Sequence, residues 1–311
     1  MKILKVVAIS KWSLIFAALW LVAACAEQPK GKEEPANDPA AETPADDRTD
    51  EDEERLSQAK KLFFALPSPI ETASLLKKAG ATYDQEVLNG HTNVSNYQTI
   101  SKKALNLGVY GADLSYSSIF EQTQQCLEYI KSARMLAAEL GIANAFNPEV
   151  MERFESNISD RDTVMNLISE VFWSANSSLK ATESSNIAAL ILSGGWVEGL
   201  YIASKMVDME NPNEQIIKRI AEQKFALENL LQLMEMYEDG DILKETHQDL
   251  KELKALFDNL DEAKADGPAT ASVNEETGVT TIGAKRELSI SPEQLAAISE
   301  KVGAIRGKYV E

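Results

Sequence analysis

The chain has 311 residues, of which 44% are hydrophobic, and it carries a formal net charge of −18. This length and hydrophobic fraction suit one large or two small folded domains and exclude a chain that is disordered throughout. Because so acidic a body is repelled by phosphate backbones and anionic lipid headgroups, we expect neither nucleic-acid binding nor flat docking on a membrane.

The first 24 residues have the pattern of a secretion signal. Lys2, Lys5 and Lys11 precede an uncharged, mainly apolar run over residues 12–24. This run is shorter than the roughly 20 apolar residues that span a bilayer, and its length is typical of a signal-peptide core. The alternative is an uncleaved membrane helix, which would bury Lys11 in hydrocarbon at a cost of a few kcal/mol.

The apolar run ends in the sequence Leu21-Val22-Ala23-Ala24-Cys25. An aliphatic residue followed by small residues and a cysteine resembles the lipobox of bacterial lipoproteins. The resemblance implies that Cys25 carries a thioether-linked diacylglycerol, that signal peptidase II cuts before it, and that its amino group is then acylated. Two or three acyl chains on one residue are enough for stable anchoring in a bilayer.

The residue that follows the cysteine bears on the choice of membrane. In lipoproteins of didermal bacteria an aspartate at this place retains the protein in the inner membrane, and here the residue is Ala26. The resemblance therefore implies a lipid-anchored protein of the cell envelope, in the outer membrane, on its periplasmic face or at the cell surface. Its expected partners are the lipid bilayer, through acylated Cys25, and another envelope protein.

Residues 25–55 form a linker behind the lipid-modified cysteine. They are rich in acids and prolines and contain almost no large apolar side chain. Such a segment cannot bury enough surface to offset its ordering entropy, so we expect a disordered tether that spans on the order of 30 Å. Its acidic cluster at residues 50–54 has a second interpretation as an export tag, because some Bacteroidota lipoproteins carry an acidic surface-export signal near the cysteine.

Residues 56–311 have the pattern of an all-α domain. Proline suits the first position of a helix, and a capping residue precedes it at four places: Ser68-Pro69, Asn147-Pro148, Asn211-Pro212 and Ser291-Pro292. In all but the second, Glu or Gln follows at the third helical position, which is the spacing of a capping box. Apolar residues also recur with helical spacing. We therefore predict a multi-helix bundle of about eight to nine helices, some of the predicted segments being merged or broken. These segments are 56–65, 69–79, 96–120, 123–140, 149–156, 160–178, 184–208, 212–238, 241–263 and 292–306.

The helical pattern is interrupted over residues 265–289. Val273 and the apolar stretch 279–282 flank Asn274-Glu275-Glu276-Thr277-Gly278, which favours a small β-hairpin near 272–283. A mobile loop is the alternative interpretation of the same residues.

Two of the predicted helices, 104–119 and 187–205, carry stripes of small residues. Glycine inside a helix costs about 1 kcal/mol, so we expect close packing at the centre of the bundle to offset that cost. The stripes consist of Ala104, Gly108, Gly111, Ala112 and Ser115 in the first helix and Ala188, Gly195, Gly199 and Ala203 in the second.

Each of these two helices also has a narrow polar strip, and Asp113 and Glu198 each precede a tyrosine by three residues. One interpretation is a solvent-facing edge or a buried polar network that fixes the packing. The other is a ligand pocket between the helices. The residues that would line this pocket are Tyr110, Asp113, Trp196, Glu198 and Tyr201.

At residues 107–116 and 194–201 the body resembles uncharacterised helical lipoproteins of Bacteroidota, and the resemblance extends over roughly residues 60–260. That group implies no activity and no catalytic residue.

Signatures of known chemistry are missing from the sequence. The two histidines, His91 and His247, stand outside any metal-binding pattern, and no phosphate-binding glycine loop or Gly-x-Ser-x-Gly motif is present. A Ser-x-x-Lys pattern begins at Ser74 and at Ser177, but the Lys-Thr-Gly motif of penicillin-binding proteins does not follow. We therefore expect no metal, no cofactor and no catalytic residue.

The second cysteine, Cys126, has no partner in the chain if Cys25 is lipidated, and we expect it to be buried and inert. Taken together, these patterns predict a membrane-anchored envelope lipoprotein with a non-enzymatic helical domain for binding or scaffolding. The alternative is a small-ligand-binding protein or an enzyme, with its pocket between helices 104–119 and 187–205.

Overall fold

The structure is a computed structural model that divides into two units, residues 1–47 and 48–311. It describes residues 61–62, 65–66, 69–158, 160–181, 184–237, 241–264, 270–273, 280–283 and 286–311. The predicted signal peptide, the lipidation site Cys25 and the tether over residues 25–55 lie outside the described residues.

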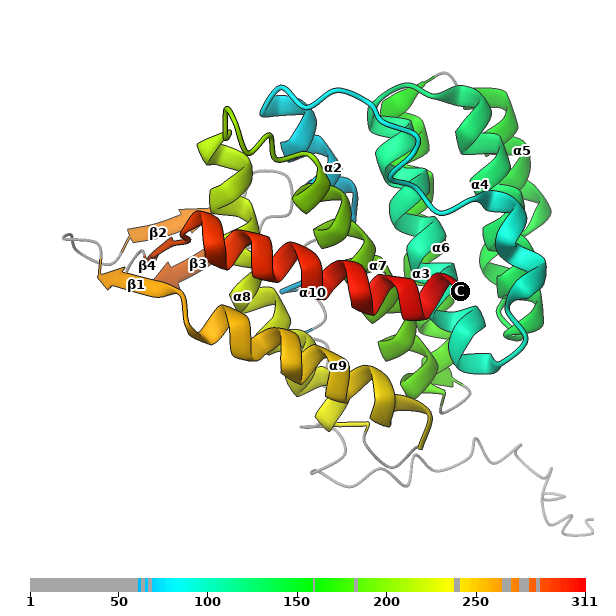
Figure 1. Ribbon diagram of the computed structural model, residues 1–311. Coiled ribbons are helices and arrows are strands. Elements are labelled where there is room, and N and C mark those ends of the chain that lie inside the picture. Colours follow the sequence, from blue (N-terminus) through cyan, green and yellow to red (C-terminus); the bar gives the residue numbers. More distant parts are fainter. Residues whose placement is uncertain are drawn as a thin grey trace, which may run out of the picture. The chain divides into compact units, whose positions relative to one another are not determined.

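The described part of the chain is an all-α bundle, as predicted, and it contains nine α-helices and two short 3-10 helices (Figure 1). The elements, in chain order, are α2 (Pro69–Lys78), η1 (His91–Asn96), α3 (Ile100–Ile119), α4 (Thr123–Glu139), η2 (Ala143–Phe146), α5 (Pro148–Asn157), α6 (Arg161–Ala181), α7 (Ser185–Lys205), α8 (Glu214–Glu235), α9 (Asp241–Asp258) and α10 (Pro292–Val310).

Local capping explains where several helices begin. In α10 the Ser291 side chain accepts from the Gln294 backbone N–H at 3.3 Å, and the Gln294 side chain accepts from the Ser291 N–H at 2.8 Å. This reciprocal pair is a capping box, as the sequence predicted. The predicted helix 96–120 begins later, at Ile100, because Thr99 caps it by accepting from the Lys102 N–H at 3.2 Å.

The start of α8 differs from the prediction. The sequence placed the cap at Asn211, before Pro212, but the helix begins at Glu214. Its cap is Asn213, whose side-chain oxygen accepts from the backbone N–H groups of Gln215 at 2.9 Å and Ile216 at 3.4 Å. An asparagine directly before the helix satisfies more of the free N–H groups than one two residues earlier.

Four short strands join α9 to α10 (Figure 1). β2 (Thr270–Val273) pairs antiparallel with β3 (Thr280–Gly283), and this pair spans the hairpin predicted near residues 272–283. An outer antiparallel pair, which the sequence analysis did not anticipate, joins β1 (Asp261–Lys264) to β4 (Arg286–Ser289).

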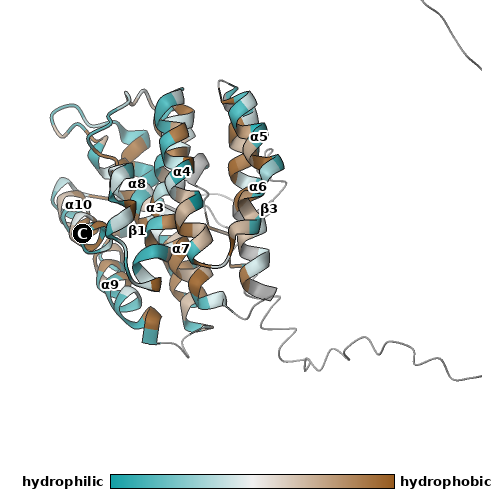
Figure 2. Cartoon of the chain, turned by 90° about the vertical axis from the view of Figure 1, so that its right-hand side faces the viewer, coloured by the Kyte–Doolittle hydropathy of each residue, from teal (hydrophilic) through white to brown (hydrophobic). Residues whose placement is uncertain are grey.

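Helices α3 and α7 form the centre of the bundle, since α3 also packs against α2 and α4, and α7 against α8 and α10. The outer helices α9 and α10 show hydrophilic as well as hydrophobic residues (Figure 2). Of the described helices, only α7 has the length and apolarity to cross a membrane, and 72% of its most apolar stretch is buried within the protein.

The backbones of α3 and α7 touch at Gly108 and Gly194. A Cβ atom on Gly108 would lie 1.9 Å from the Ile191 carbonyl oxygen, and one on Gly194 would lie 1.9 Å from the Leu105 carbonyl oxygen. Such distances exclude any side chain larger than hydrogen, so the expected close approach of these two helices is present.

Two glycines of the predicted stripes, Gly111 and Gly199, make no close contact at this crossing. A Cβ atom on Gly111 would meet nothing within 4 Å, and one on Gly199 would meet only the Thr72 methyl group at 3.8 Å. The second stripe is thus right at Gly195, whose backbone nitrogen would lie 2.6 Å from a Cβ atom on Gly108, and wrong at Gly199. Gly194, which the stripe omitted, also makes the contact.

Candidate functional site

Asp113 on α3 and Glu198 on α7 meet in the interior of the protein. Both carboxyl groups are fully buried, with an exposed fraction of 0%, and they lie within hydrogen-bonding reach of each other. The tight crossing of the two helices at Gly108 and Gly194 brings these side chains together from elements that are distant in the sequence. Two adjacent carboxyl groups without solvent require a compensating group nearby.

That compensating group is Arg306 on α10. Its Nε donates to one oxygen of Glu198 at 2.9 Å and its terminal nitrogen donates to the other at 3.0 Å. The same terminal nitrogen donates to the carbonyl oxygen of Val87 at 3.3 Å, and the guanidinium group stacks on the Tyr201 ring at 4.5 Å from its centroid. This two-point ion pair fixes α10 to α7 and to the segment between α2 and α3.

Sequence reasoning missed Arg306. It lies 108 residues from Glu198, on a helix whose small residues Ser299, Gly303 and Gly307 recur every fourth position, as in the stripe of α7. This spacing, and the place of Arg306 directly after the buried Ile305, are the signals in the sequence that point to this face of α10.

Asn89 connects this carboxyl pair to its surroundings. Its backbone N–H donates to the Oδ2 atom of Asp113 at 3.3 Å, and its carbonyl oxygen accepts from the Tyr129 hydroxyl at 2.9 Å. Its side-chain nitrogen donates to the Tyr97 hydroxyl at 2.8 Å and to Asn106 Oδ1 at 3.2 Å. The segment before η1 is therefore held by α3 and α4 through one buried asparagine.

A second buried asparagine extends the network to the end of α10. The Asn106 side-chain nitrogen donates to the carbonyl oxygen of Tyr309 at 2.7 Å, and to that of Lys102 at 2.9 Å. The Lys102 ammonium group donates to the carbonyl oxygen of Lys308. The bonds to Tyr309 and Lys308 satisfy backbone carbonyl groups in the last turn of α10, which have no partner within the helix.

Burial shifts the ionisation of the carboxyl pair. Burial, together with the neighbouring Glu198, raises the pKa of Asp113 well above its usual range, and Arg306 offsets only part of this effect. Burial also raises the pKa of Glu198, while the hydrogen bonds and the charge of Arg306 act in the opposite direction. Arg306 thus favours the charged form of Glu198, and Asp113 is the member that favours its neutral form.

The structure brings together four of the five predicted pocket residues. The Tyr110 hydroxyl is buried and donates to the carbonyl oxygen of Gly90 at 3.1 Å, close to Asn89, and Tyr201 lies under Arg306. Burial raises the pKa of Tyr110 far above its usual value. Trp196 lies apart, because its indole N–H donates to Gln223 on α8 at 2.9 Å.

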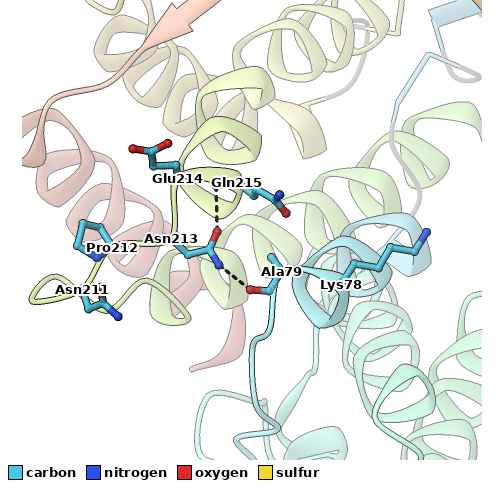
Figure 3. A pocket seen from close by; sticks show the side chains of 7 residues that line it. All are labelled: Lys78, Ala79, Asn211, Pro212, Asn213, Glu214 and Gln215. Carbon is cyan, nitrogen blue, oxygen red and sulfur yellow. Dashed lines mark hydrogen bonds between the residues drawn. The ribbon is translucent and has the colours of Figure 1, made fainter.

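A hollow of about 520 Å³ lies elsewhere, between the end of α2 and the start of α8 (Figure 3). It is lined by Lys78, Ala79 and residues 211–215, and none of the predicted pocket residues lines it. Its central side chain, Asn213, already caps α8 and donates to the carbonyl oxygen of Ala79 at 2.5 Å. The polar groups of Asn213 are therefore used within the fold.

Cys126 is buried in α4, with 2% of its surface exposed. Burial raises the pKa of its thiol to about 12, which keeps the reactive thiolate form rare at neutral pH. In the part of the chain that the structure describes, no group of three or more histidine, cysteine and acidic side chains is arranged to hold a metal ion.

Comparisons of this chain with protein-family models, with curated proteins and with solved structures give no match. Assignments of function therefore rest on the residues themselves.

Proposed function

We propose that this protein is a lipoprotein of the cell envelope, anchored through acylated Cys25, whose helical domain binds or scaffolds another envelope component without catalysis. The observation that carries the non-catalytic part is the geometry of Asp113 and Glu198. Both carboxyl groups are fully buried, and the groups that donate hydrogen bonds to them are the Asn89 N–H and the Arg306 guanidinium group. A substrate reaches neither group unless the bundle opens.

The crossing of α3 and α7 argues against the alternative of a ligand pocket between these helices. Because a methyl group on Gly108 would overlap the Ile191 carbonyl oxygen, a ligand at this crossing would have to separate the two backbones. Separation would also expose the apolar face of α7, which is the most apolar helix in the described part of the chain. Such a change costs more free energy than the binding of a small ligand usually supplies.

The proposed anchor rests on the sequence Leu21-Val22-Ala23-Ala24-Cys25 at the end of an apolar run. The acidity of the chain makes a covalent anchor the reasonable means of membrane attachment, since charge alone would repel it from anionic lipid. A protein held in this way acts within reach of its tether, and this favours a binding or scaffolding role over action on freely diffusing partners.

The anchor is tested by expressing the full chain in a didermal bacterium fed with labelled palmitate. We expect the parent protein and Cys126→Ala to incorporate the label and to appear in the membrane fraction. Cys25→Ala should do neither. Cys126→Ala is the matched control, because it removes the other thiol and leaves the proposed lipidation site. Labelling of Cys25→Ala, or an unmodified thiol at Cys25 in the parent protein, would contradict the anchor.

The binding role is tested in the native envelope by placing a photo-crosslinking amino acid at exposed apolar positions. Ile100, Met135 and Met209 are suitable, since about half of each side chain is exposed. We expect at least one position to give a discrete adduct with an envelope protein, and the Cys25→Ala background to lose it. Absence of adducts at all three positions in the anchored protein would argue against a protein partner.

A further inference from the structure

Among several buried side-chain oxygen atoms that lack a hydrogen-bond partner in the described part of the chain, one belongs to the carboxyl pair. Asp113 Oδ1 is sealed from solvent, and among the described residues no N–H or hydroxyl group donates to it. Its sister atom Oδ2 accepts from the Asn89 N–H. Because buried acceptors in folded proteins are almost always satisfied, Oδ1 requires an explanation.

The carboxyl group of Asp113 lies within hydrogen-bonding reach of another acceptor, the carboxyl group of Glu198. Both Glu198 oxygens already receive hydrogen bonds from Arg306, and Arg306 is the one cation among the described residues that forms an ion pair with either acid. Two ionised carboxylates side by side in a dry site, beside a single cation, repel each other strongly.

The remaining titratable groups near the pair are phenols. Besides Tyr201, which stacks on Arg306, there are four: Tyr110 on the helix of Asp113, Tyr129 on α4, and Tyr83 and Tyr97 in the segment between α2 and α3. Burial raises the pKa of each, so all four are neutral at physiological pH. None of them can supply the positive charge that a second carboxylate would need.

We propose that Asp113 and Glu198 bind one proton between them at neutral pH, held on Asp113 Oδ1 and donated to the Glu198 carboxylate. The proton gives Oδ1 its missing partner as a donor and leaves one negative charge to face the one positive charge of Arg306. This inference is independent of the proposed envelope function, since it concerns only the contacts within the bundle.

The proton binds at a junction of the fold. Asp113 belongs to α3, Glu198 to α7 and Arg306 to α10, while Asn89 and Val87 bring in the segment before η1. Loss of the proton to hydroxide in solution would leave two carboxylates facing one guanidinium group. The ion pair that docks α10 would then be opposed by an unpaired buried charge.

The proton itself is detected by infrared spectroscopy of the full chain at neutral pH. A neutral carboxylic acid has a carbonyl stretch that carboxylates lack, and we expect this band in the parent protein and its loss in Asp113→Asn. Asp241→Asn is the matched control, because Asp241 is fully exposed and pairs with Lys244, and its substitution should leave the band unchanged. A parent protein without the band, or a band that survives in Asp113→Asn, would overturn the proposal.

A stability measurement gives a second, separate readout. The amide of Asp113→Asn can accept from Asn89 and donate to Glu198, as the neutral acid does, so we expect its melting midpoint at neutral pH to match or exceed that of the parent. Glu198→Gln removes the charge that faces Arg306, and we expect its midpoint to fall by several degrees. Equal losses in the two variants, including failure of Asp113→Asn to fold, would overturn the proposal.

Discussion

Glu198 and Arg306 form a two-point ion pair inside the protein, with nitrogen-to-oxygen distances of 2.9 and 3.0 Å and 108 residues of chain between them. The Glu198 side chain is fully buried and 14% of the Arg306 side chain is exposed. A buried pair of this kind contributes little net stability compared with a well-packed apolar pair, but losing one partner is costly. Its structural effect is to define where α10 docks.

Arg306→Met should therefore destabilise the protein strongly. The substitution keeps much of the apolar stem and leaves the Glu198 charge without a partner, for which we expect a loss of about 3–5 kcal/mol in the free energy of unfolding. Urea denaturation measures this loss. Arg219→Met is the control, since it breaks an exposed pair with Glu222 and should cost less than about 1 kcal/mol. Similar losses in the two variants would contradict the assignment.

Gly108→Ala should destabilise the crossing of α3 and α7. The new methyl group would lie 1.9 Å from the Ile191 carbonyl oxygen, so one of the backbones must move, and we expect a loss of about 1–3 kcal/mol or more. The matched control is Gly111→Ala in the same helix, where a methyl group meets nothing within 4 Å. Removing that glycine should be neutral or stabilise by up to about 1 kcal/mol. If thermal unfolding shows Gly108→Ala to be more stable than Gly111→Ala, the contact between α3 and α7 at Gly108 is refuted.

The raised pKa of Asp113 predicts a specific pH dependence. In the unfolded chain this carboxyl group ionises near its ordinary pKa of about 3.9, whereas burial and Glu198 keep it protonated to higher pH in the folded protein. The folded state therefore binds more protons above about pH 4, and stability falls as the pH rises through the raised pKa.

Asp113→Asn removes this contribution, so the stability of the parent relative to the variant should decline from acid toward alkaline pH. Exposed acids with lowered pKa, such as Asp241 and Glu252, have the opposite dependence at acid pH, but they are common to both proteins and cancel in the difference. A difference that stays constant with pH, or that grows in favour of the parent, would be inconsistent with a raised pKa at Asp113.

The buried thiol of Cys126 should be unreactive in the folded protein. In the full-length Cys25→Ala variant it is the single thiol of the chain. We expect a thiol reagent to label it fully in urea and negligibly under native conditions, because 2% of the residue is exposed and burial raises its pKa to about 12. Rapid native labelling would show that α4 opens readily.

Local signals in the sequence predicted the helices well, and the reasons are visible in the caps. Ser291 and Gln294 form their capping box within one turn of chain, so no distant contact is needed to specify it. Asn211 and Asn213 are both suitable capping residues for α8, and local propensity favoured Asn211, which was wrong. The position of the cap also depends on the hydrogen bond from Asn213 to the carbonyl oxygen of Ala79 on another segment.

The candidate site was only half predictable. Asp113 and Glu198 stand out as acids within helices that are otherwise small and apolar, and this contrast identified them. Arg306 lies on a helix with charged residues on several sides, such as Glu300 and Lys308, and its place next to Ile305 does not by itself show that it turns inward. That choice is made by tertiary packing, which brings α10 against α7.

The central claim is that the buried acids serve the fold through Arg306, and a double-mutant cycle with Glu198→Gln and Arg306→Met tests it most directly. We predict that the double variant is more stable than the sum of the two single losses implies, with a coupling free energy of about 2–3 kcal/mol in urea denaturation. Strictly additive losses would contradict the account, because they would mean that the two side chains do not depend on each other.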